Sequence, residues 1–65
     1  MWRVDGFKTK EEAKEFSKKN GGIVLFEERT PKRKQLTWVG KEYQIAMQAT
    51  GLSKEVNPFI VERRV

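Results

Sequence analysis

The basic residues Arg29, Lys32, Arg33 and Lys34 lie within six positions and form the sharpest concentration of charge in this sequence. Cationic side chains spaced so closely attract phosphate groups or the acidic surface of another protein. Trp38 follows the cluster by four residues and would add one aromatic ring. These five residues predict contact with a nucleic-acid phosphate backbone, weak and independent of base sequence. The same pattern is also typical of a hairpin tip that has no ligand and keeps a sheet edge soluble.

Side chains for catalysis are scarce in this chain. There is no histidine to act as a general base, and there is no cysteine to act as a nucleophile or metal ligand. Nine carboxylates are present, but Glu27 and Glu28 adjoin Arg29 and are expected to be its ion partners. The sequence therefore predicts a protein that is not an enzyme and that holds no metal and no cofactor.

Length and charge limit the classes to which the protein can belong. A chain of 65 residues predicts one compact domain over residues 1–65, with a small core. No apolar stretch approaches the roughly 20 residues that span a bilayer. The absence of cysteine fits a reducing compartment. We therefore expect a cytoplasmic protein without membrane contact, and its net charge of +5 is typical of small phage-like accessory proteins.

The elements that must position the basic cluster follow from local patterns. Thr9 with Glu12 has capping-box spacing and predicts a helix that ends at Asn20–Gly21, with Ala13 and Phe16 facing inward. The predicted strands are Trp2–Asp5, the apolar run Ile23–Phe26, a third strand around Leu36–Trp38, and Phe59–Val65 after Pro58. The basic cluster would then form the turn between the second and third strands.

The segment from Lys41 to Thr50 fits two structures. As a helix it contains strong helix formers and is followed by Gly51 as a stop signal. As a strand it would pair with the preceding one through a tight turn at Gly40–Lys41. We favour the helix, because only Ile45 and Thr50 in this segment are β-branched.

Each alternative predicts a different α+β fold. The helix gives a two-layer β-α-β-β-α-β order, the ferredoxin-like split βαβ arrangement, with both helices on one face of an antiparallel sheet. The strand gives β-α-β-β-β-β, with a single helix on a mostly antiparallel sheet.

The helical order, with its basic turn between the second and third strands, resembles the RNA recognition motif. The stretch from Lys34 to Lys41 retains the basic lead, one aromatic residue (Trp38) and the valine (Val39) of that family's third-strand motif. Both glycines and two aromatic residues of the motif are absent. The resemblance therefore implies phosphate binding without the aromatic platform that stacks bases.

A second functional class is a protein-interaction module or homodimer. A strand as apolar as Ile23–Phe26 needs cover on both faces, and a chain this short has little core with which to supply it. A partner could close the sheet against Val24, Phe26 and Ile60. The aromatic residues Trp2, Tyr43 and Phe59 are expected to pack in the core, with Trp38 as the exception.

Overall fold

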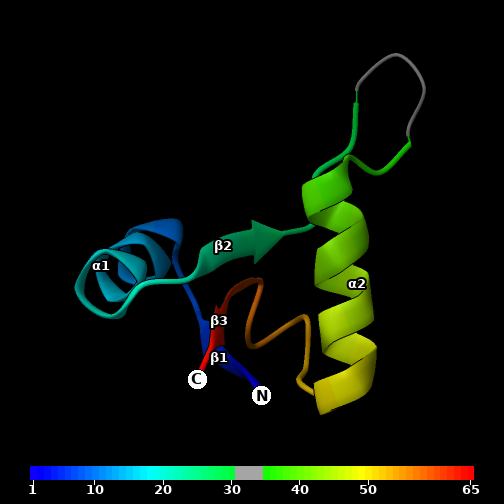
Figure 1. The fold of residues 1–65 in the computed structure, drawn as a ribbon. Coiled ribbons are helices and arrows are strands. Elements are labelled where there is room, and N and C mark those ends of the chain that lie inside the picture. Colours follow the sequence, from blue (N-terminus) through cyan, green and yellow to red (C-terminus); the bar gives the residue numbers. More distant parts are fainter. Residues whose placement is uncertain (31–34) are drawn as a thin grey trace.

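The computed structural model describes residues 1–30 and 35–65 and contains two helices and a three-stranded sheet (Figure 1). In chain order the elements are β1 (Trp2–Phe7), α1 (Lys10–Asn20), β2 (Ile23–Phe26), α2 (Trp38–Thr50) and β3 (Phe59–Arg64). This is an α+β fold. Within the described residues, no helix has the length and apolar character needed to cross a membrane.

Helix α1 forms where its capping signals predicted. The hydroxyl of Thr9 accepts a hydrogen bond from the backbone N–H of Glu12 at 3.3 Å, which satisfies one amide of the first turn. The helix stops at Gly21, whose positive φ of 81° suits glycine. Ala13 is fully buried, and the Phe16 ring lies 5.1 Å from that of Phe7 on β1. The predicted inward face of this helix is confirmed.

The last strand lies in the middle of the sheet. The strand order is β1-β3-β2, and β3 pairs antiparallel with both neighbours. Helix α1 thus joins two strands that flank a third, which is the split βαβ connection. Strand β1 continues through Gly6 to Phe7, beyond the end that the glycine predicted, because its whole length pairs with β3.

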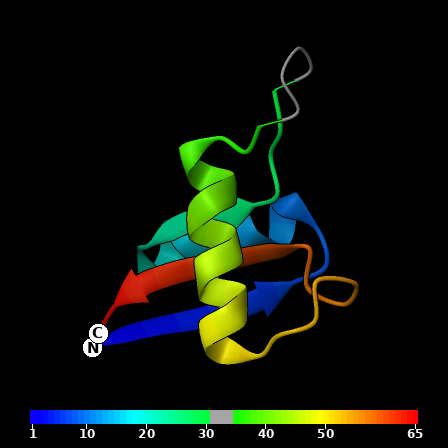
Figure 2. The same ribbon diagram turned by 90° about the vertical axis from the view of Figure 1, so that its right-hand side faces the viewer.

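The two helices cover opposite faces of the sheet, which corrects the expectation that both lie on one face. Figures 1 and 2 show α1 on one side and α2 on the other. Side chains of adjacent strand residues point to opposite faces, and Ile60 and Val61 are both 0% exposed. Ile60 packs with Leu25, Tyr43 and Ala46 on the α2 side. A single covered face could not bury both residues.

The segment 41–50 is helical, so the favoured alternative is confirmed and the one-helix alternative is wrong. Gly51 caps the helix in the left-handed conformation, its N–H donates to the carbonyl of Met47 at 2.9 Å, and Leu52 packs against the core. The helix begins earlier than predicted, at Trp38, because the Thr37 hydroxyl accepts from the backbone N–H of Gly40 at 3.3 Å.

The predicted third strand at Leu36–Trp38 is therefore wrong. Trp38 and Val39 belong to α2, so the residues that resemble a third-strand RNA-binding motif are helical. The described residues form three strands in the order β-α-β-α-β, rather than the four strands of a ferredoxin-like domain. Two apolar residues separated by one polar residue, as in Leu36-Thr37-Trp38, are typical of a strand but also occur where a loop meets the start of a helix.

Candidate nucleic-acid interface

Residues 28–30 and 35–37, which flank the basic cluster between β2 and α2, pair antiparallel as the stem of a short hairpin. Arg29 pairs with Leu36, and the backbone N–H of Thr30 donates to the carbonyl of Gln35 at 3.0 Å. Nearer the helix, the N–H of Thr37 donates to the carbonyl of Glu28 at 3.1 Å. These bonds join the two sides of the hairpin stem (residues 28–30 and 35–37).

The stem rests directly on the first turn of α2. Gly40 is buried there, and a Cβ atom at this position would lie 2.9 Å from the carbonyl oxygen of Glu28. A helix interior normally disfavours glycine, so its presence at this position reflects the close approach of the two backbones. The Glu28 carboxylate also accepts a hydrogen bond from the Thr37 hydroxyl at 3.2 Å. The cap of α2 and the hairpin stem thus form one connected unit.

Glu27 ties the base of this hairpin to the loop before β3. Its Oε1 accepts from Nε and Nη2 of Arg29 at 3.1 and 2.9 Å, and its Oε2 forms an ion pair with Lys54. The expected pairing of Glu27 with Arg29 is confirmed. Hydrogen bonds from Lys54 and then Arg29 hold the pKa of Glu27 below its usual range. The Arg29 guanidinium is therefore already engaged by an anion, which reduces its share in any phosphate contact.

This network predicts a pH-dependent contribution to stability. Because the pKa of Glu27 is lower in the folded than in the unfolded chain, its stabilisation is present at neutral pH. That stabilisation is lost as the pH falls through the folded pKa. We expect Glu27→Gln to lower the melting temperature by a few degrees at pH 7 and to have little effect in strong acid. Thermal unfolding followed by circular dichroism at both pH values measures this.

A matched control is Glu55→Gln, which removes the same charge from an exposed residue that makes no ion pair within the described parts of the chain. It should leave the melting temperature nearly unchanged at pH 7. Equal effects of the two substitutions would show that Glu27 contributes only general charge.

The structure places two of the five predicted site residues. Arg29 lies on the hairpin stem, and Trp38 is the first residue of α2 with 64% of its surface exposed. Trp38 thus directly follows the Thr37 cap at the base of the hairpin. Lys32, Arg33 and Lys34 lie outside the described residues. The expectation that Trp38 differs from the core aromatics is confirmed, whereas Trp2, expected in the core, is 61% exposed.

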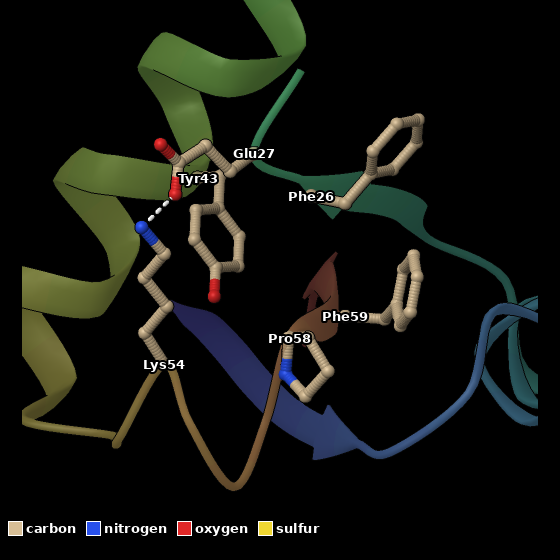
Figure 3. Close-up of a pocket in the computed structure, with 6 residues that line it drawn as sticks. All are labelled: Phe26, Glu27, Tyr43, Lys54, Pro58 and Phe59. Carbon is tan, nitrogen blue, oxygen red and sulfur yellow. Dashed lines mark ion pairs between the residues drawn. The ribbon is translucent and has the colours of Figure 1, made fainter.

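A small cavity of about 190 Å³ lies below the hairpin, between the end of β2 and the start of β3. Its lining residues (Figure 3) are Phe26, Glu27, Tyr43, Lys54, Pro58 and Phe59. Three of the six are aromatic, and the Glu27–Lys54 ion pair lies on one side. An apolar group would fit there better than an anion, because the lysine is already neutralised.

Chemically reactive groups are few around this cavity. The Tyr43 hydroxyl donates to the carbonyl of Asn57 at 3.1 Å, and burial raises the pKa of that hydroxyl. It therefore stays protonated and acts as a structural donor. In the described parts of the chain, no three acidic side chains gather closely enough to hold a metal ion.

Sequence reasoning missed three features of this region. The Glu27–Lys54 pair joins residues far apart in the chain, so no local pattern indicates it. The stem pairing of Arg29 with Leu36 replaces the longer strand that was expected. The Thr37 cap had a usable signal, because a threonine followed by a long stretch without proline is a favourable helix start.

Comparisons of the chain with protein-family models, with curated proteins and with solved structures found no match.

Proposed function

We propose that this protein binds the phosphate backbone of nucleic acid, weakly and without sequence preference, through its basic hairpin and the adjoining Trp38. One observation supports this above all: Trp38 is largely exposed at the base of the hairpin that carries the basic residues. An exposed tryptophan next to clustered cations is the combination that proteins use to hold single strands, with stacking for the bases and charge for the phosphates.

The surroundings of Trp38 favour an anion. It begins a helix whose own first turn contains no acidic residue, and the start of a helix carries partial positive charge, part of which the Glu28 carboxylate at the Thr37 hydroxyl already offsets. The cations of the segment, by sequence, are Lys32, Arg33 and Lys34. Arg29 contributes less, since Glu27 already binds its guanidinium. One aromatic ring cannot read a base sequence, so affinity should depend on salt and strand type instead.

Reversal of the three lysine and arginine charges tests the proposal. We expect the triple variant Lys32→Glu, Arg33→Glu, Lys34→Glu to lose at least about 90% of its affinity for a fluorescein-labelled oligonucleotide at low salt, because each phosphate contact contributes to counterion release. Fluorescence anisotropy measures the binding. The matched control reverses Lys8, Lys14 and Lys18, which are exposed around α1, and removes the same total charge. The control should retain most of the affinity.

Substitution of Trp38 separates stacking from charge in the same assay. Trp38→Ala should weaken binding to a single strand about tenfold and leave duplex binding nearly unchanged, because paired bases offer it no free face. Trp2→Ala removes an equally exposed tryptophan elsewhere and is the control. If the parent protein does not bind at low salt, or if both triple variants weaken binding equally, the proposed site is wrong.

A further inference from the structure

The face of the sheet that α2 covers is only partly covered. Helix α2 crosses the strands and leaves uncovered the part of this face nearest the two chain ends (Figure 2). The helix packs against the level of Ile60 and Leu25. Beyond Ile60, toward the chain ends, lie the level of Glu62, where Val4 packs against the edge of that core, and the level of Arg64. We name their side chains the open face, and its residues are Trp2, Val4, Ile23, Glu62 and Arg64.

Strand pairing shows that these five residues share one side of the sheet. Directly paired residues of antiparallel strands point the same way. Trp2 pairs with Arg64, and Glu62 pairs with Val4 on one side and Ile23 on the other. Glu62 lies two residues from Ile60, on the same face of β3. The open face is therefore apolar on its outer strands and charged along its central strand.

Two of the three apolar residues of the open face are exposed, whereas Val4 is partly buried. Trp2 is 61% exposed and Ile23 is 50% exposed, although both lie on paired strands. The two residues flank the charged central strand, and exposed apolar side chains on one face of a sheet mark a surface that a protein partner covers.

Of the charges on the central strand, Arg63 pairs with Asp5 on the other face of the sheet, and Glu62 and Arg64 lie on the open face. Neither Glu62 nor Arg64 makes an ion pair within residues 1–30 and 35–65. Burial, followed by repulsion from Glu42 of α2, raises the pKa of Glu62. A cation beside the Glu62 carboxylate would stabilise its charged form and so offset the unfavourable effects of burial and of Glu42. Phosphate would not fit here, because the two carboxylates repel it.

We propose that a second copy of this chain covers the open face, with a two-fold axis that pairs Glu62 of each copy with Arg64 of the other. In a two-fold dimer, if residue i contacts residue j of the partner, then j contacts i. Glu62 and Arg64 lie two strand positions apart, roughly 6.6 Å, on the same face of β3. A two-fold axis midway between them therefore brings each Glu62 opposite the Arg64 of the other copy. This axis runs perpendicular to β3 at the level of Arg63, in the plane between the two sheets. The two copies of β3 therefore run antiparallel.

The rest of the open face agrees with this arrangement. The same axis places Trp2 of one copy over Val4 of the other, so apolar area meets apolar area. Helix α2 crosses the sheet away from the two chain ends, so the second sheet would pack beside the helix rather than over it (Figure 2). The open face has five residues, far fewer than the roughly 20–30 per partner of a standard interface, so we expect a dimer that dissociates on dilution.

Charge reversal across the pair tests the dimer by sedimentation equilibrium over a wide concentration range. We expect Glu62→Arg and Arg64→Glu each to weaken self-association at least about tenfold, because like charges then oppose each other. An equimolar mixture of the two single variants should dimerise again, since all four charges become complementary. A mixture that stays monomeric, or single variants that dimerise like the parent, would overturn the pairing.

The tryptophans provide a second test that does not depend on charge. Trp2→Ala should weaken self-association about tenfold, and Trp38→Ala should leave it unchanged. In the oligonucleotide assay these two variants exchange roles, so a failed dimer and a failed nucleic-acid site give different results. A parent protein that stays monomeric at every concentration excludes a second copy as the occupant, even if a foreign protein binds the face.

Discussion

Gly22→Ala is expected to be among the most destabilising single-methyl additions in this chain, with a loss of roughly 2–5 kcal/mol in the free energy of unfolding. Gly22 has a φ of +112°, a conformation that residues with a Cβ atom rarely adopt. A Cβ atom there would also lie 2.8 Å from Cγ1 of Val61 and 2.9 Å from the carbonyl oxygen of Glu62. The oxygen belongs to the central strand and cannot move without disturbing the sheet.

The neighbouring glycine provides the control. Gly21 also has a positive φ, of 81°, but nothing lies within 4 Å of a Cβ atom built on it. Gly21→Ala should therefore cost only the backbone strain, about 1–3 kcal/mol. Urea unfolding followed by circular dichroism measures both. If the two variants were equally stable, the close approach of Gly22 to β3 would be excluded.

Ile60→Ala is expected to remove about 2–5 kcal/mol of stability by leaving a cavity at the centre of the sheet. Ile60 is fully buried on the middle strand, in one cluster with Leu25, Tyr43 and Ala46. A chain this short has a total stability of only about 3–5 kcal/mol, so a large fraction of the variant should be unfolded at 25 °C. Urea unfolding in dilute solution gives the midpoint.

Ile23→Ala is the matched control, because Ile23 lies on the same face of the same sheet, one level from Ile60. It is half exposed and lies on an edge strand, so its truncation should cost less than about 1.5 kcal/mol in the monomer. An equal loss for the two isoleucines would mean that the core does not centre on β3. The complete burial of Ile60 also excludes it from the edge contact that the apolar strands suggested for a homodimer.

Local signals predicted the start of α1 and the C-terminal ends of both helices more reliably than the strands. Thr9 and the glycines at 21 and 51 act through hydrogen bonds and φ values within a few residues, so their effect can be read without the fold. Alternating apolar residues are less specific. Leu36 and Trp38 alternate as in a strand, yet the Thr37 cap between them starts a helix.

The partners of the basic cluster could not be predicted in full. The sequence shows the basic charge of residues 29–34 and the neighbouring Glu27, and it predicted the ion pair between Glu27 and Arg29. It does not show Lys54 at the same carboxylate, or the contact of the hairpin stem with Gly40. These contacts depend on how the loop before β3 and the first turn of α2 meet, which no local pattern records.

The sequence by itself determined the α+β class, the position of α1, the helical state of residues 41–50 and the basic character of the hairpin. Only the tertiary structure decided that the helices cover opposite faces and that β3 lies between β1 and β2. The physical reason is that Ile60 and Val61 are consecutive apolar residues, which demand cover on both sides of their strand but do not specify which elements provide it.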